Sequence, residues 1–112
     1  MSVARLLVIQ NADDDPVGRL GDWLAAAGLI LDVRDPNVGG ALPDDLDGYA
    51  GLLVLGGGMG AADDALAPWL PSVRALLRHA VADELPTLGI CLGAQLLATA
   101  NGGTVEIGRA HV

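Results

Sequence analysis

The chain has 112 residues, of which 52% are hydrophobic and 16 are glycine, so it is long enough to bury one core and too apolar to be disordered. It carries 14 acidic residues, six arginines and no lysine; the formal charge of −8 would repel nucleic acid, and a P-loop would need a lysine. A single cysteine permits no internal disulfide, and with no targeting segment in view the composition predicts a cytoplasmic protein.

The first half of the chain alternates short apolar runs with an amphipathic segment. Pro16 follows three aspartates that can cap a helix, and Gly28 is a natural place for that helix to end. The predicted elements are a strand at 5–10, a helix at 16–27, a strand at 29–33, a loop at 35–48 and a strand at 51–55.

The second half repeats the alternation. A glycine loop at 56–60 precedes a helix that should end near residues 83–85, and a strand at 86–90 leads into a helix that stops at residues 102–103. The apolar face of the first of these helices is predicted from Trp69, Val73, Leu76, Leu77, Ala80 and Val81.

Strands and helices in this order predict an α/β fold with a doubly wound parallel sheet of flavodoxin-like type, in one partial domain over residues 1–112. Residues 104–112 begin what reads as a further strand, and a sheet that ended there would leave an unpaired edge. We therefore expect a truncated domain. The uncharged stretch 85–105 is long enough for a membrane span, but its proline and glycines favour a buried strand plus helix.

Cys91 stands at the predicted turn between the strand at 86–90 and the helix that follows it. Gly89 and Gly93 lie two residues to either side, and small residues there relieve the crowding around a nucleophile held on a sharp strand-to-helix turn. The positive end of the helix dipole also favours the thiolate. We predict that Cys91 is a catalytic nucleophile; the alternative is an inert, buried cysteine.

The glycine run at 56–60 follows another strand of the same predicted sheet. Because the carboxyl ends of neighbouring parallel strands meet at one crevice, its backbone N–H groups can face Cys91 and hold an oxyanion. The alternative is a flexible turn with no further role.

A dinucleotide-binding fingerprint is a competing interpretation of these glycines. Gly56, Gly58 and Ala61 fit it literally. That motif should open a helix directly, whereas residues 63–64 and Pro68 intervene, and the two carboxylates would repel a pyrophosphate. We expect no nucleotide site.

The remaining titratable residues predict no further site. His79 lies on the polar side of its helix and His111 is one residue from the end, so neither is expected to act as a base. The aspartates at 13–15 suit a helix cap better than a cation site, and the other acidic residues are expected to be solvated. Two isolated histidines and one cysteine have no metal-ligand spacing, so we predict neither metal nor cofactor.

Two segments resemble class I glutamine amidotransferases, most closely their stand-alone, GMP-synthase-like branch: GLLVLGGGMG at residues 51–60 and PTLGICLGAQLLA at residues 86–98. The resemblance covers essentially the whole chain, and the second segment is highly specific. It implies that the glutamine side-chain amide is hydrolysed through a γ-glutamyl thioester, with ammonia passed to an acceptor.

The resemblance also implies roles for individual residues. Cys91 matches the nucleophile, Gly57 and the backbone N–H of Leu92 match the oxyanion hole, and Gln95 and Gly58 match positions that seat the substrate glutamine. The family usually has a proline where this chain has Gly58. No metal or cofactor is implied.

The family completes its triad with a His-x-Glu pair downstream of the point where this chain ends. General acid–base catalysis is typically worth about 10²–10⁴-fold, so we expect the chain alone to be nearly inactive. A synthetase partner, the missing C-terminal half or a second copy of the chain is the expected partner. Two alternatives remain open: a γ-glutamyl peptidase or DJ-1/PfpI-like cysteine hydrolase on the same fold, and a non-catalytic, truncated interaction module.

Overall fold

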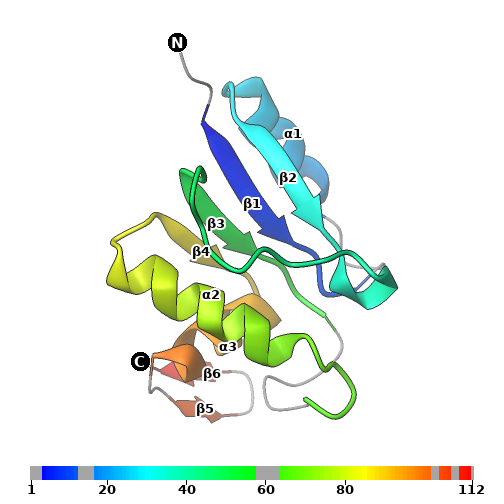
Figure 1. The fold of residues 1–112 in the computed structure, drawn as a ribbon, viewed down its shortest axis with the longest axis vertical. Helices are drawn as coiled ribbons and strands as arrows, with labels where there is room; N and C mark the ends of the chain where they lie inside the picture. Colours follow the sequence, from blue (N-terminus) through cyan, green and yellow to red (C-terminus); the bar gives the residue numbers. More distant parts are fainter. Residues whose placement is uncertain (1–3, 13–16, 58–63, 102–103, 107–108, 112) are drawn as a thin grey trace.

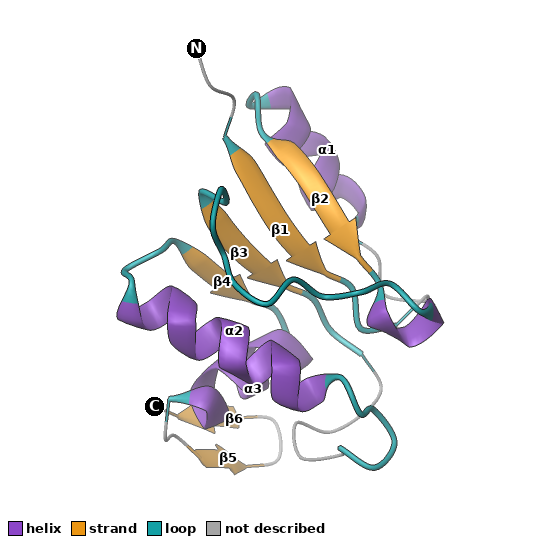
Figure 2. Cartoon of the chain, viewed as in Figure 1, coloured by secondary structure: helices purple, strands orange, loops and turns teal. Residues whose placement is uncertain are grey.

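The structure, a computed structural model, describes residues 4–12, 17–57, 64–101, 104–106 and 109–111. Strands and helices alternate along most of the chain, as predicted (Figure 1, Figure 2). The elements are β1 (Arg5–Ile9), α1 (Gly18–Ala26), β2 (Ile30–Arg34), the 3-10 helix η1 (Pro36–Val38), β3 (Gly51–Val54), α2 (Leu70–Ala82), β4 (Thr87–Gly89), α3 (Leu92–Ala100), β5 (Thr104–Glu106) and β6 (Arg109–His111).

The first four strands form one parallel sheet in the order β2-β1-β3-β4. In the registers of the central pairs, Leu52 of β3 lies opposite Leu7 of β1 and Thr87 of β4. Helix α1 covers one face of this sheet, and α2 and α3 lie on the opposite face (Figure 1). The predicted α/β, doubly wound parallel sheet is therefore confirmed, with the order of the first strands of a flavodoxin-like fold.

Alternation along the strands divides the core between the two faces. Leu7 and Ile9 of β1 pack with α2 and α3, whereas Val8 between them packs on the α1 side. Leu96 of α3 is fully buried in the larger cluster. Burying a leucine of this kind contributes about 1.5–3 kcal/mol. The cluster shared with α2 and α3 has 13 buried residues and the one on the α1 side has three, so the former contributes most of the apolar stabilisation of the described core.

Helix α1 begins two residues later than the sequence predicted. Its N-cap is Val17, which makes no side-chain capping hydrogen bond, so Pro16 is not its first residue. The aspartates proposed as caps, residues 13–15, lie with Pro16 outside the described residues. The C-terminal prediction is confirmed: α1 ends at Ala26, and Gly28 has φ +93°, a left-handed value that suits glycine.

Helix α2 confirms most of its predicted apolar face. Val73, Leu76, Leu77 and Ala80 are buried, but Val81 is 46% exposed, so its assignment to the buried face was wrong. A residue lies 100° further around a helix than the one before it, which puts Val81 beyond the edge of the stripe that ends at Ala80.

The end of the chain differs from the prediction of one further strand over residues 104–112. Strands β5 and β6 pair with each other in antiparallel fashion, separately from the main sheet, and lie against α3. Only two residues separate Glu106 from Arg109, a spacing that permits antiparallel but not parallel pairing.

The uncharged stretch at 85–105 folds as the sequence predicted, into strand followed by helix. It contains β4, α3 and part of β5. Helix α3 has nine residues, about 14 Å at 1.5 Å each, roughly half the thickness of a bilayer core. Across the described ranges, no helix combines the length and apolarity needed to cross a membrane.

Candidate active site

Cys91 forms the turn between β4 and α3. It is the N-cap residue of α3, with φ 53° and ψ −112°, and its thiol is unpaired and exposed. A non-glycine residue at such dihedrals carries strain of about 1–3 kcal/mol, which surrounding structure must hold in place. The predicted strained turn is present, and exposure contradicts the alternative of a buried, inert cysteine.

Hydrogen bonds hold this turn on both sides of the cysteine. The Ile90 amide donates to the Val54 carbonyl oxygen at 3.0 Å, and the Gly93 amide donates to the Ile90 carbonyl oxygen at 2.9 Å. The Gln95 amide donates to the Cys91 carbonyl oxygen at 3.1 Å and closes the first turn of α3. The backbone around the thiol is therefore tied to β3 before the cysteine and to α3 after it.

The two glycines beside Cys91 are required by close packing. A Cβ atom on Gly93 would overlap the carbonyl oxygen of Val54, and one on Gly89 would lie 2.5 Å from the carbonyl carbon and oxygen of Gly93. Real Cβ atoms essentially never approach backbone atoms within 3.0 Å. Helix α3 can therefore start directly against β3 and β4 only with glycine at both positions, which is the crowding that the sequence predicted.

Two of the other predicted site residues, Leu92 and Gln95, lie in the first turn of α3. Leu92 is the first residue of α3, where a backbone N–H has no carbonyl partner within its own helix. Gln95 lies one turn later and is half-buried. Gly57 follows β3, the strand to which Ile90 is bonded, whereas Gly58 lies outside the described residues.

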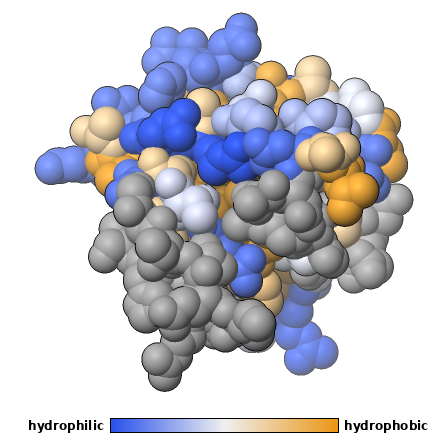
Figure 3. All heavy atoms as spheres, turned by 90° about the horizontal axis from the view of Figure 1, so that it is seen from below, coloured by the Kyte–Doolittle hydropathy of each residue, from blue (hydrophilic) through white to orange (hydrophobic). Residues whose placement is uncertain are grey.

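The carboxyl ends of the parallel strands bring these segments to one side of the molecule. The strand arrows of Figure 1 point toward this side, and Figure 3 views it from below. Its described surface is mixed, with hydrophilic side chains next to apolar ones (Figure 3).

Sequence analysis missed Asn11, which immediately follows the first predicted strand segment. Asn11 is fully buried and hydrogen-bonds both to the backbone of Leu55, at the end of β3, and to the indole of Trp69. Trp69 was predicted only as an apolar residue of its helix. The one local signal was an amide side chain directly after an apolar run, which says nothing about a partner 44 or 58 positions away.

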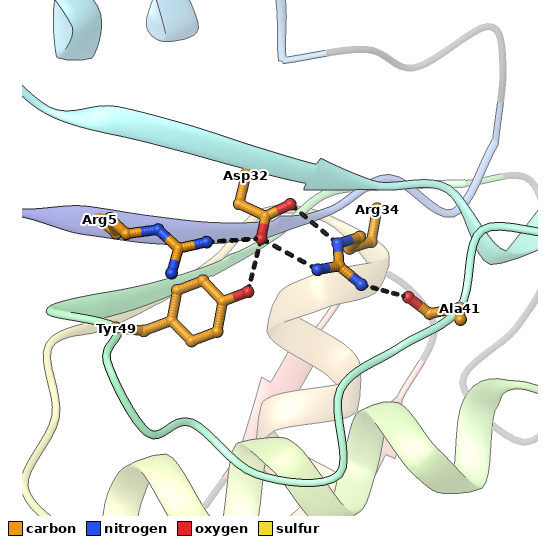
Figure 4. Close-up of polar contacts among 5 residues, drawn as sticks. All are labelled: Arg5, Asp32, Arg34, Ala41 and Tyr49. Atoms are coloured by element: carbon orange, nitrogen blue, oxygen red, sulfur yellow. Dashed lines mark hydrogen bonds and ion pairs between the residues drawn. The ribbon is translucent and has the colours of Figure 1, made fainter.

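Sequence analysis also missed a polar cluster that joins the 35–50 loop to the sheet (Figure 4). Asp32 accepts hydrogen bonds from Arg34 Nε at 2.8 Å, Tyr49 Oη at 2.6 Å and Arg5 at 3.1 Å, and Arg34 also donates to the Ala41 carbonyl oxygen at 2.8 Å. The expectation of a solvated carboxylate was wrong for Asp32, whose side chain is only 18% exposed. Strand pairing creates the cluster, because Arg5 lies on β1 and Asp32 on β2.

This environment changes the acidity of two groups. The hydrogen bonds from Arg34 and Tyr49 are the main cause that lowers the pKa of Asp32 to about 2. Burial, followed by the neighbouring Asp32 carboxylate, raises the pKa of the Tyr49 hydroxyl. These charged groups hold the 35–50 loop against the sheet through Tyr49, which bonds to Asp32, and through Ala41, which accepts from Arg34.

The two histidines lie in different places. His79 is exposed on α2, as predicted, and the backbone of His111 is in β6. In the part of the chain that the structure describes, no three His, Cys, Asp or Glu residues are grouped so that they could hold a metal ion. The aspartates at 13–15 are not among those residues.

Residues 35–111 match the family model for class-I glutamine amidotransferases. The structure is similar to that of a glutamine amido transferase from Methylobacillus flagellatus, with a TM-score of 0.86 and 39% identity over 94% of this chain and 41% of the other. It is also similar to a glutamine amidotransferase from Thermotoga maritima, with a TM-score of 0.83 and 31% identity over 93% of this chain and 45% of the other. The chain thus spans less than half the length of either solved structure. No curated protein matches it significantly.

Proposed function

Because the chain belongs to the class-I glutamine amidotransferase family, we propose that it supplies the cysteine nucleophile for hydrolysis of the glutamine side-chain amide. The Cys91 sulfur attacks the amide carbon, the carbon–nitrogen bond breaks, and ammonia leaves with an added proton. Water then attacks the γ-glutamyl thioester, which releases glutamate and frees the sulfur. The observation that carries this proposal is an exposed thiol on a strained strand-to-helix turn.

Backbone N–H groups are proposed to stabilise the negative charge that develops on the amide oxygen. The candidates are Leu92, at the N-terminus of α3, and Gly57, at the end of the neighbouring strand. One such donor is typically worth about 10²–10³-fold in rate. Gln95 and Gly58 are proposed to seat the substrate glutamine, and the half-buried position of Gln95 one turn after Cys91 supports its part.

A partner is part of the proposal, since nucleophilic attack and release of ammonia both require proton transfer. A partner that supplies an imidazole and a carboxylate would complete the triad, and we propose a synthetase or the remainder of a longer domain for this part. We place the chain near the GMP-synthase-like branch on the motif at 86–98. A cytoplasmic location is proposed from the free thiol, which a reducing compartment would preserve.

Labelling with diazo-oxo-norleucine, a glutamine analogue that alkylates thiols, tests the proposal. Cys91 is the only cysteine in the chain, so any thiol adduct found by mass spectrometry is on that residue. We expect labelling that excess L-glutamine slows and excess D-glutamine does not. Iodoacetamide, which needs no glutamine site, is the control, and Cys91→Ser should react with neither reagent. Labelling that L-glutamine leaves unchanged, while iodoacetamide reacts normally, would refute the proposal.

A further inference from the structure

Asn11 joins three segments that are far apart in the sequence. Its side chain is 0% exposed; Nδ2 donates to the Leu55 carbonyl oxygen at 2.8 Å, and Oδ1 accepts from Trp69 Nε1 at 3.0 Å. The three segments are the end of β1, the end of β3 and the residue that caps α2. A buried amide with both ends bonded resists any movement of its neighbours, because an unpaired buried polar group costs about 1–3 kcal/mol.

The chemistry of the two partners determines the orientation of the Asn11 amide. A backbone carbonyl can only accept, so the amide nitrogen must face Leu55, and an indole N–H can only donate, so the amide oxygen must face Trp69. Asn11 is thus a specific connector between these two partners, because its amide has a donor at one end and an acceptor at the other.

The bond to Leu55 holds the segment that leads to Gly57. The Leu55 amide donates to the Ile9 carbonyl oxygen at 3.0 Å, so β1 and the residue after its end hold both backbone polar groups of Leu55. Gly56 and Gly57 come next and have no side chains of their own to fix their dihedrals. Contacts from outside the loop are therefore needed to set the direction of the Gly57 N–H, and the bonds to Leu55, two residues earlier, are contacts of this kind.

We infer that Asn11 is a positioning residue that sets the backbone of Leu55–Gly57 and so aims the Gly57 N–H toward the carbonyl attacked by Cys91. This inference rests on the proposed function, and it extends the site to β1 and to the start of α2. Trp69 contributes to this positioning, because its indole N–H fixes the oxygen end of the Asn11 amide.

The test compares two reactions of the same thiol in the unmodified chain and in three variants. Acylation by a γ-glutamyl 4-nitrophenyl ester forms the thioester and releases 4-nitrophenolate, so it passes through an oxyanion. Alkylation by iodoacetamide displaces iodide and needs no oxyanion hole. Asn11→Leu, close in size to asparagine, removes both bonds; Trp69→Phe removes only the indole bond; Tyr49→Phe loses a hydrogen bond in the Asp32 cluster and is the control.

We expect Asn11→Leu to slow acylation by about 10-fold or more and to leave alkylation within about twofold, because losing one oxyanion donor is worth 10²–10³-fold. Trp69→Phe should slow acylation by a smaller factor, and Tyr49→Phe should change neither rate. An unchanged ratio of acylation to alkylation in Asn11→Leu would overturn the inference. If Asn11→Leu does not fold, the ratio of acylation to alkylation is measured in Trp69→Phe, and an unchanged ratio there would overturn the inference.

A second readout separates this inference from the proposed function. If the unmodified chain is alkylated but not acylated, the thiol step of the proposed function fails in this chain by itself, and amide hydrogen exchange then tests the connector directly. Exchange at the Leu55 amide, which donates to the Ile9 carbonyl oxygen at 3.0 Å, should be about 10-fold faster in Asn11→Leu than in Tyr49→Phe, because loss of the Asn11 bond eases local opening of this segment. Equal exchange in the two variants would overturn the positioning role.

Discussion

The amide of Ile90 donates a hydrogen bond to the carbonyl oxygen of Val54 at 3.0 Å, and this bond ties the residue before Cys91 to the last residue of β3. The same carbonyl oxygen is the atom that a side chain on Gly93 would strike. The Val54 carbonyl oxygen therefore fixes Ile90 at the start of the turn and leaves no room for a side chain at position 93. The strained dihedrals of Cys91 persist because Ile90 is bonded to Val54 on one side and Gly93 packs directly against Val54 on the other.

Gly93→Ala should destabilise the protein by about 1–3 kcal/mol, since α3 must shift away from the Val54 carbonyl to accommodate a methyl group. Urea unfolding followed by circular dichroism would measure the change. Gly21→Ala in α1 is the matched control, because its new methyl group meets only side-chain atoms of Val17 and Leu31. Equal unfolding free energies for the two variants would contradict the account of close packing at Gly93.

Cys91→Gly should raise the free energy of unfolding by about 1 kcal/mol relative to Cys91→Ala, because φ 53° and ψ −112° are strained for alanine and accessible to glycine. The thiol is exposed, so neither variant loses a buried contact. Chemical denaturation of both variants at one pH measures the difference. An alanine variant as stable as the glycine variant would show that the turn stores no strain.

Asp32 should make the protein sensitive to acid. Its pKa is lowered from 3.8 to about 2 in the folded state, so the stabilisation is complete above the unfolded value and is lost as pH falls from about 4 through 2. Because Asp32 lies near the surface, where solvent screens its charge, this stabilisation is on the order of 1 kcal/mol.

Unfolding free energies of the unmodified chain and of Asp32→Asn, measured from pH 5 to pH 2, test this expectation. Their difference should shrink toward acid pH, because both proteins then have a neutral group at residue 32. Asp22→Asn removes an exposed carboxylate on α1 and controls for the change in net charge. Parallel curves for the unmodified chain and Asp32→Asn would mean that the cluster contributes nothing that depends on pH.

Leu96→Ala should destabilise the protein by about 2–5 kcal/mol, because this side chain is fully buried between α3 and the sheet and its loss leaves a cavity. The neighbouring Leu97 is only partly buried, so Leu97→Ala is a matched control with a smaller expected loss. Thermal unfolding of both variants would rank them. The reverse order would show that α3 is not anchored in the core through Leu96.

Local sequence determined the alternation of strands and helices and the Gly89-x-Cys91-x-Gly93 turn. These features depend on contacts between residues close in the chain: an apolar run forms a strand, a glycine ends a helix, and small residues flank a sharp turn. Errors occurred at element ends, where the start of α1 and the exposure of Val81 depend on small differences between neighbouring positions.

Tertiary structure alone decided which distant residues meet. Asn11 reaches Leu55 and Trp69 across 44 and 58 positions, and Tyr49 reaches Asp32 across 17. A polar side chain has the same local sequence signature whether it faces water or a buried partner, and strand order selects the partner. The sequence by itself therefore determined that Cys91 stands at the strand-to-helix turn. The packing of β1, β3 and α2 decided what holds the neighbouring backbone, because such hydrogen bonds join groups that the chain brings together only when it folds.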